Sequence, residues 1–267
     1  MGSKAITQFW GSGVGGKFFL VDKLLARLPA HTRYIEPFVG AGSVFWGKNP
    51  AEREWISDAD TQVARAYYDI KVMRSDDFDR LERMDWTPDP TRFQQFRLDI
   101  VAAPLQDPTE SLFRFLYLKR HSFQRQMKQF APNVVPPRDF FPRLRLAHRR
   151  LRNVHVAASD VLPALADHAA YETAFAYLDP PYPGTGQKLR NRDLLYNYDD
   201  LQRLSDFLKD HWQGLFMMSV ANTPPTREIL SPFLIEEVTT RRTAGLWRKE
   251  GAIKEGIELI VSNYEIG

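Results

Sequence analysis

The residues best suited to chemistry are four consecutive ones, Asp179-Pro180-Pro181-Tyr182, which directly follow the apolar run 174–178. A short apolar run of this kind is typical of a buried strand, and two prolines end its ladder because they lack N–H donors. The turn would therefore aim a carboxylate and unpaired carbonyls at one point, a set of acceptors that suits an amino group. Tyr182 adds a ring that can stack on a base, an interaction worth ~1–3 kcal/mol. A strand-ending turn with a surface carboxylate is the alternative interpretation.

A second group of residues lies upstream, where Glu36-Pro37-Phe38 leads into Gly40-Ala41-Gly42 and the expected start of a helix. Glycines let a backbone approach a ligand closely, and a helix N-terminus favours negative charge. Asp58 ends the next expected strand, sixteen residues after Gly42. An acidic residue about 20 residues past such a turn is placed to bind ribose hydroxyls. The pattern predicts a nucleoside-bearing cofactor; a tight turn followed by a surface aspartate is the alternative.

Together with two further motifs, these residues resemble the Dam-type, alpha-group family of DNA adenine-N6 methyltransferases. The additional motifs are Gly15-Gly16-Lys17 and the segment 258–264, and the order of all the motifs along the chain also matches. Matched segments run from about residue 9 to 264, which is nearly the whole chain. The resemblance implies an α/β, Rossmann-like fold that uses S-adenosylmethionine. It also implies that the target base binds at Asp179, Pro180, Pro181 and Tyr182.

The resemblance further implies which residues contact the cofactor. In this family the G-G-K element does so, and Lys17 is expected to pair with the methionine carboxylate. Gly13 stands where the family has an aromatic residue, and Trp10 is the candidate for that role. Asp160 follows the expected strand 153–157 and would lie near the adenine, with capping of the next helix as an equally good explanation. The expected cofactor contacts are Trp10, Lys17, Glu36, Phe38, Gly40, Gly42, Asp58, Asp160 and Asp179.

The composition fits a single sizeable core with a smaller module, since 43% of the 267 residues are hydrophobic. The chain has no cysteine, which excludes disulfides and thiolate metal sites, and its six histidines show no ligand spacing. No apolar run reaches the length of a membrane span, and residues 1–4 lack the apolar region of a signal peptide. We therefore expect a metal-independent, cytoplasmic protein of bacterial or phage type.

Charge is distributed unevenly along the chain. The segment 114–152 contains eleven Lys and Arg residues and one acid, Asp139, so it carries +10 while the whole chain carries only +3. A basic block in an otherwise acidic protein is typical of a polyanion partner, with a solvated helix face as the alternative. Aromatic residues are interleaved with it and could pack a small core or contact bases. The residues expected to bind DNA are Arg120, Gln124, Arg125, Lys128 and Arg138.

The spacing of apolar residues and turn signals predicts the elements that hold these groups. Strands are expected at 33–35, 54–58, 153–157, 174–178, 215–220 and 259–264. Helices are expected at 21–28, 61–71, 111–127, 143–151, 161–165 and 199–211, with short helical pieces between 76 and 106 and an irregular loop at 131–142. The division that follows is a catalytic domain at 1–69 and 146–267, interrupted by an inserted, mostly helical target-recognition module at 70–145.

These features predict an adenine-specific DNA methyltransferase that acts on a base flipped out of double-stranded DNA. The Asp179 carboxylate and the Pro180 carbonyl would accept the two amino hydrogens while the nitrogen attacks the methyl group in line. The absence of cysteine excludes the covalent route of cytosine C5 methylation. Methylation of cytosine N4 or of RNA remains an alternative within the same chemistry. A nucleic-acid-binding protein with a degenerate methyltransferase fold is the alternative from another class.

Overall fold

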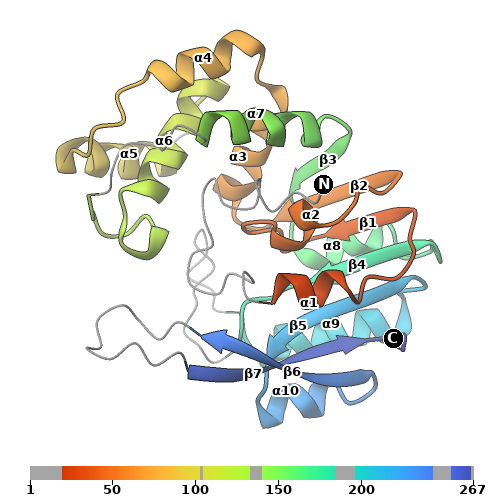
Figure 1. Cartoon of the computed structure of the whole chain (residues 1–267). Coiled ribbons are helices and arrows are strands. Elements are labelled where there is room, and N and C mark those ends of the chain that lie inside the picture. Colours follow the sequence, from red (N-terminus) through yellow and green to blue (C-terminus); the bar gives the residue numbers. More distant parts are fainter. Residues whose placement is uncertain (1–19, 103–104, 133–139, 184–195, 243–253, 266–267) are drawn as a thin grey trace. The chain divides into compact units, whose positions relative to one another are not determined.

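The computed structural model describes residues 20–102, 105–132, 140–183, 196–242 and 254–265 (Figure 1). The chain divides into two compact units. One takes its described residues from Gly40–Asn49 and Thr61–Ala158, and we call it the helical unit. The other takes them from Phe19–Val39, Pro50–Asp60 and Ser159–Gly267, and we call it the sheet unit.

Six described strands of the sheet unit form one sheet. These six follow the spatial order β2-β1-β4-β5-β7-β6. Strands β2, β1, β4 and β5 are parallel, whereas β7 is antiparallel to both β5 and β6. Their bounds are β1 (Arg33–Glu36), β2 (Arg53–Asp58), β4 (Ala174–Leu178), β5 (Leu215–Ala221), β6 (Leu234–Arg242) and β7 (Lys254–Ser262). This arrangement confirms the predicted mixed α/β, Rossmann-like class.

The order of the strands creates a topological switch point. Along the chain, β1 is followed by β2 on one side, whereas β4, the neighbour of β1 on the other side, is followed by β5. In open α/β sheets, ligands bind outside the carboxyl ends of the strands at such a point. The sequence places Glu36 at the end of β1 and Asp179 directly after β4, so these two acids flank the switch point.

A hydrophobic core covers one face of this sheet. All five residues of β4 are buried, and Ala176 and Leu178 join a cluster with Leu201, Leu204 and Leu208 of α9 (Tyr198–Asp210). The leucines lie three and four residues apart, as expected for one side of a helix. Asn197 and Asp200 form a capping box that fixes where α9 begins. Short helices complete the unit: α1 (Val21–Leu25), α8 (Val161–Ala166) and α10 (Pro224–Ile229).

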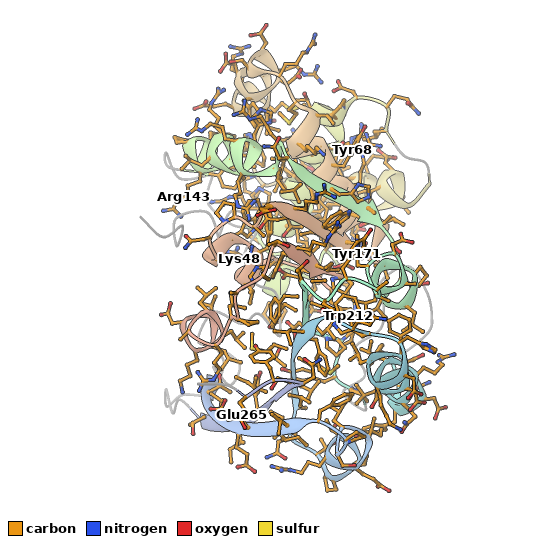
Figure 2. The ribbon with its side chains drawn as sticks, turned by 90° about the vertical axis from the view of Figure 1, so that its right-hand side faces the viewer. Lys48, Tyr68, Arg143, Tyr171, Trp212 and Glu265 are labelled. Carbon is orange, nitrogen blue, oxygen red and sulfur yellow. The ribbon has the colours of Figure 1, made fainter. Side chains whose placement is uncertain are left out.

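Trp212, labelled in Figure 2, closes the same core where the chain passes from α9 to β5. Its indole N–H donates to the carbonyl of Leu215 at 3.2 Å, and the side chain is only 6% exposed. This contact satisfies the polar tip of the ring while its body packs against the cluster.

The helical unit contains α2 (Ser43–Gly47), α3 (Thr61–Val72), α4 (Ser75–Arg83), α5 (Pro90–Ala102), α6 (Pro108–Arg120), the 3₁₀ turn η1 (Phe123–Arg125), α7 (Phe140–Leu151) and strand β3 (Val154–Ala158). Its core is aromatic. The ring of Trp86 lies edge-on to Phe113, Phe140 and Phe141, with centroids 4.9 to 6.0 Å apart. Phe140 and Phe141 come from the basic segment 114–152, and two more of its aromatic residues, Phe115 and Tyr117, are also buried, so most of that segment's described aromatic side chains form a core.

Two of the expected element bounds were wrong, and two elements were not predicted. The helix predicted over 111–127 ends at Arg120, the loop predicted to reach residue 142 gives way to α7 at Phe140, and neither α10 nor β6 was predicted. The functional division into a catalytic domain and a recognition module at 70–145 stays a prediction. Within the described ranges, no helix has the length and apolar character needed to cross a membrane.

Candidate active site at the carboxyl edge of the sheet

The Asp179-Pro180-Pro181-Tyr182 turn begins where β4 ends, as the sequence predicts. Asp179 is half-buried, and its Oδ1 accepts a hydrogen bond from the hydroxyl of Ser219 on β5 at 3.3 Å. Pro180 is buried, and Pro181 and Tyr182 are half-buried. The turn is therefore partly enclosed by the sheet unit and is not a fully solvated surface turn.

Tyr182 is held by a carboxylate on β7. Its hydroxyl donates to Glu258 Oε2 at 2.9 Å, and Glu258 is only 8% exposed. Glu258 pairs with Ala221 of β5 on one side and Val238 of β6 on the other. Because a strand between two partners is rigid, this contact fixes the tip of the Tyr182 ring.

At the end of β1, Glu36 is 2% exposed and accepts the hydroxyl of Tyr34 at 2.5 Å. Burial, followed by the negative charge of Glu36, raises the pKa of Tyr34 well above its ordinary value. Tyr34 therefore stays a hydrogen-bond donor across the physiological range. Phe38, two residues after the strand, is half-buried and lies edge-on to Tyr196 with centroids 6.2 Å apart.

Asp58 ends β2, as predicted, and is half-buried. Its Oδ1 accepts the backbone N–H of Asp60 at 2.8 Å, which fixes the carboxylate through a local turn. Asp160 occupies the N-cap position of α8, but its exposed side chain makes no capping hydrogen bond. The capping explanation for the Asp160 side chain is therefore wrong, while its proposed contact with the cofactor stays a prediction.

Three acids thus come to one edge of the sheet from distant parts of the sequence. Glu36, Asp58 and Asp179 stand at the carboxyl ends of β1, β2 and β4, which are neighbouring parallel strands. Adjacent strands lie about 4.8 Å apart, and Glu36 is level with Ile56, two residues before Asp58, so the three acids are spread along one edge of the sheet. A row of carboxylates with a tyrosine ring after β4 suits a ligand that carries positive charge, amino groups or hydroxyl groups.

The sequence analysis missed Tyr177, Ser219 and Glu258 as parts of this edge. Each left a signal in the sequence. Tyr177 lies two residues before Asp179 and so shares its side of the strand, and Ser219 is the one hydroxyl in the apolar run 215–220. Glu258 is an acid at the start of the apolar run 259–261. Their partners could not be identified without the order of the strands.

The glycine turn belongs to the helical unit. Gly40 and Gly42 both have positive φ, 46° and 69°, in the left-handed region that favours glycine. A Cβ atom at Gly42 would lie 2.5 Å from Tyr67 Oη and 2.9 Å from Trp46 Nε1. Tyr67 also donates to the carbonyl of Gly40 at 3.3 Å. The predicted turn is thus present, and the close approach at Gly42 is made by side chains of α2 and α3.

Of the expected DNA contacts, Gln124, Arg125 and Lys128 belong to one loop of the helical unit, residues 121–131, and Arg120 directly precedes it. An isolated antiparallel bridge between Ser122 and Phe130 closes this loop, and Phe123 N–H donates to Gln129 O at 3.0 Å. Arg125 and Met127 have positive φ, 56° and 59°, which costs of order 1–3 kcal/mol for non-glycine residues. Such strain is concentrated at functional sites more often than elsewhere.

The two arginines at this loop, Arg120 and Arg125, are half-buried. Burial lowers the pKa of Arg120 and Arg125, and the positive charge of Arg125 lowers that of Arg120 further. Lys128 is exposed, and the ring of Phe123 is 43% exposed. Two cations held close together attract an anion more strongly than either does alone. Trp10, Lys17 and Arg138 lie outside the described residues, as does the side chain of Gln124.

Other arginines of the basic segment have intramolecular partners. Arg114 forms ion pairs with Asp99 and Glu110, and Arg145 pairs with Asp79. The guanidinium of Arg150 lies 4.3 Å from the ring centroid of Phe45. Part of the segment's charge is therefore used within the unit. In the described ranges, no group of three or more His, Asp or Glu side chains is arranged to hold a metal ion.

Comparison with known proteins identifies the class to which this fold and site belong. The family model for D12 class N6 adenine-specific DNA methyltransferases matches residues 14–244, and the chain belongs to this family. The resemblance inferred from the motifs is thereby confirmed.

Individual relatives agree with this assignment. The chain is 28% identical over 179 residues to the DNA adenine methylase of Escherichia coli K12, a match that covers 63% of this chain and 62% of the relative. It is 32% identical over 179 residues to the DNA adenine methylase of Serratia marcescens, covering 63% and 64% of the two chains. The corresponding protein of Vibrio cholerae is 28% identical over 180 residues. The matched region spans less than two thirds of each relative.

Proposed function

We propose that this protein transfers a methyl group from S-adenosylmethionine to N6 of an adenine flipped out of double-stranded DNA. The observation that carries the proposal is the Asp179–Tyr182 turn, which stands beside the switch point of the sheet with its carboxylate and its ring both held by neighbouring strands. Membership of the family makes adenine the expected base.

The target base would bind through the acceptors of this turn. The Asp179 carboxylate and the Pro180 carbonyl accept the two hydrogens of the amino group, which draws the nitrogen lone pair out of conjugation with the ring. Tyr182 stacks on the base, and this stacking of ~1–3 kcal/mol offsets part of the few kcal/mol that flipping costs. S-adenosylmethionine would supply the methyl group: as the nitrogen lone pair forms the new bond to carbon, the carbon–sulfur bond would break with its electrons left on sulfur. The methylated nitrogen would then release one proton to solvent, so atoms and charge balance.

The cofactor would occupy the same edge of the sheet. Asp58 would accept hydrogen bonds from ribose hydroxyls, and Glu36 and Asp160 would supply further acceptors from β1 and from the start of α8. Phe38 offers an apolar wall. The positive sulfonium matches the negative charge of the three strand-end acids. Trp10, Lys17, Gly40 and Gly42 complete the proposed set through the family resemblance.

DNA would be bound by the module at 70–145 through the loop 121–131. Arg120, Arg125 and Lys128 are suited to phosphates, and the exposed ring of Phe123 is suited to stacking on a base. Replacing the three basic residues by Gln should weaken duplex binding and flatten its salt dependence by up to about three units, since each phosphate contact releases about one counterion. Cofactor affinity should stay unchanged. A triple variant with unchanged DNA affinity and salt slope would refute this assignment.

The decisive experiment is transfer of a tritiated methyl group to duplex DNA, followed by separation of the nucleosides. N6-methyladenine is the expected product, whereas N4-methylcytosine, or a preference for RNA, would refute the proposal. Asp179→Ala should abolish transfer while leaving the fold intact. Asp210→Ala, an exposed acid at the end of α9, is the matched control. Activity of Asp179→Ala within about tenfold of the control, ~1.4 kcal/mol, would exclude Asp179 from the reaction.

A further inference from the structure

The Asp179 carboxylate is the last member of a short chain of hydroxyl groups inside the sheet unit. Ser219 Oγ lies 3.3 Å from Asp179 Oδ1 and 2.9 Å from the hydroxyl of Tyr177. Ser219 is fully buried and Tyr177 is 1% exposed. An ionised carboxylate only accepts hydrogen bonds, so Ser219 donates to Asp179 and Tyr177 in turn donates to Ser219.

The geometry of the strands explains why these three groups meet. Tyr177 and Asp179 are two residues apart and project from the same side of β4 and its extension. Ser219 follows Met218, which pairs with Leu178, so Ser219 stands level with Asp179 on the neighbouring strand. The contact therefore depends on the β4–β5 register and cannot form in any other pairing of these strands.

We propose that Ser219 and Tyr177 are positioning residues, which hold the Asp179 carboxylate in the orientation that accepts the amino hydrogens of the target base. This inference rests on the proposed function. A carboxylate tied through one oxygen to a buried strand loses freedom to turn about its side-chain bonds. Alignment of the reacting groups supplies much of the rate in such a transfer, and a misplacement of about 1 Å costs ~100-fold.

The position of Ser219 supports a role beyond folding. A hydroxyl buried in an apolar strand adds little net stability, because burying it costs free energy that its hydrogen bonds only repay. Replacing both hydroxyls together, Tyr177 by Phe and Ser219 by Ala, would leave a core of about the same stability, because no buried hydroxyl of this pair would then lose its partner. What Ser219 contributes is the hydrogen bond that its hydroxyl donates to Asp179. The hydrogen bond from Tyr177 polarises the Ser219 hydroxyl and so strengthens it as a donor.

The test measures kcat separately from the dissociation constants of S-adenosylmethionine and duplex DNA, using the full chain. Ser219→Ala should lower kcat on the order of 10-fold to 100-fold, with both dissociation constants within about twofold of wild type. Ser219→Cys keeps the shape and a weak donor and should recover part of the loss. Ser205→Ala is the matched control, because Ser205 is equally buried but donates to the carbonyl of Ile229, away from Asp179.

A double-mutant cycle tests whether Tyr177 acts through Ser219. Tyr177→Phe should lower kcat by less than Ser219→Ala, and it should have no further effect when added to Ser219→Ala. Effects that multiply in the double variant would overturn the proposed chain. So would a Ser219→Ala variant that keeps the kcat of the Ser205→Ala control, or one that loses only affinity.

The methyl-transfer activity of the wild-type protein shows whether a negative result concerns the proposed function or only this inference. If wild type transfers no methyl group to adenine, the proposed function fails and the inference fails with it. If wild type is active and the Ser219 variants match their control, only the inference is overturned. Thermal unfolding of each variant shows whether that variant is folded. If Ser219→Ala does not fold, the conservative changes Tyr177→Phe and Ser219→Cys take its place in the test.

Discussion

The most quantitative prediction concerns Gly42, where an added methyl group meets two independent obstacles. Its φ of 69° is a left-handed conformation, which costs an L-residue with a Cβ roughly 1–2 kcal/mol. The new Cβ would also lie 2.5 Å from Tyr67 Oη and 2.9 Å from Trp46 Nε1, well inside normal contact. Overpacking of this kind costs typically ~1–3 kcal/mol. Gly42→Ala should therefore reduce the free energy of unfolding by about 2–5 kcal/mol, a large part of the total of about 5–15 kcal/mol for a typical domain.

Urea denaturation of four variants separates the two contributions. Tyr67→Phe removes the hydroxyl that the new Cβ would meet, so Gly42→Ala should cost less in the Tyr67→Phe background, with a coupling energy of roughly 0.5–3 kcal/mol. The remaining loss is the backbone contribution together with the contact to Trp46. Gly47→Ala is the control: Gly47 lies in α2 and is not among the described glycines of positive φ, so alanine is tolerated there. A loss below about 1 kcal/mol for Gly42→Ala, or additive effects with Tyr67→Phe, would refute this reasoning.

Three further predictions concern single carboxylates. Asp58→Ala should weaken S-adenosylmethionine binding, measured by calorimetry, by about 1.5–3 kcal/mol, and unchanged affinity would limit Asp58 to its local turn. Glu258→Ala should release the Tyr182 hydroxyl and lower kcat, whereas Glu258→Gln keeps an acceptor and should retain more activity; equal losses would count against this contact. Burial raises the pKa of Asp69 to about 6 from 3.8, so its contribution to stability is full below about pH 4 and is lost as the pH rises through 6. That loss amounts to about 3 kcal/mol, and Asp69→Asn should flatten urea-measured stability between about pH 4 and pH 7; an unchanged pH dependence would show that Asp69 titrates normally.

Local signals in the sequence were enough to predict the strand and the helix next to the candidate site. The five apolar residues 174–178 followed by two prolines predicted both β4 and its end, and the leucine spacing in 201–208 predicted α9. These predictions succeeded because the residues that decide each element are neighbours in the chain. The contacts of Asp179 with Ser219 and of Tyr182 with Glu258 join residues 40 and 76 positions apart, and they depend on the order and register of strands that are distant in the sequence.

The errors also have physical reasons. No Gly or Pro ends the helix predicted over 111–127, and the chain leaves the helix because Ser122 Oγ accepts the N–H of Met127 and the loop 121–131 closes on itself. Strand β6 was missed because its sequence, Leu-Ile-Glu-Glu-Val-Thr-Thr-Arg-Arg, is too polar to read as buried. Helix α10 did leave a signal, since Thr223 caps it and prolines fill its first turn.

The place of β7 has a consequence for how the active site is assembled as the chain folds. Strand β7 follows β6 in the chain but lies between β5 and β6, so β6 has no partner in the sheet until β7 has inserted. Glu258 arrives with that same insertion, and only then can the Tyr182 hydroxyl be held. Strand β7 follows both of its partners, β5 and β6, in the chain. The contact that fixes the ring of Tyr182 therefore forms only once the chain has been synthesised through β7, and a chain that has folded only as far as β6 lacks it.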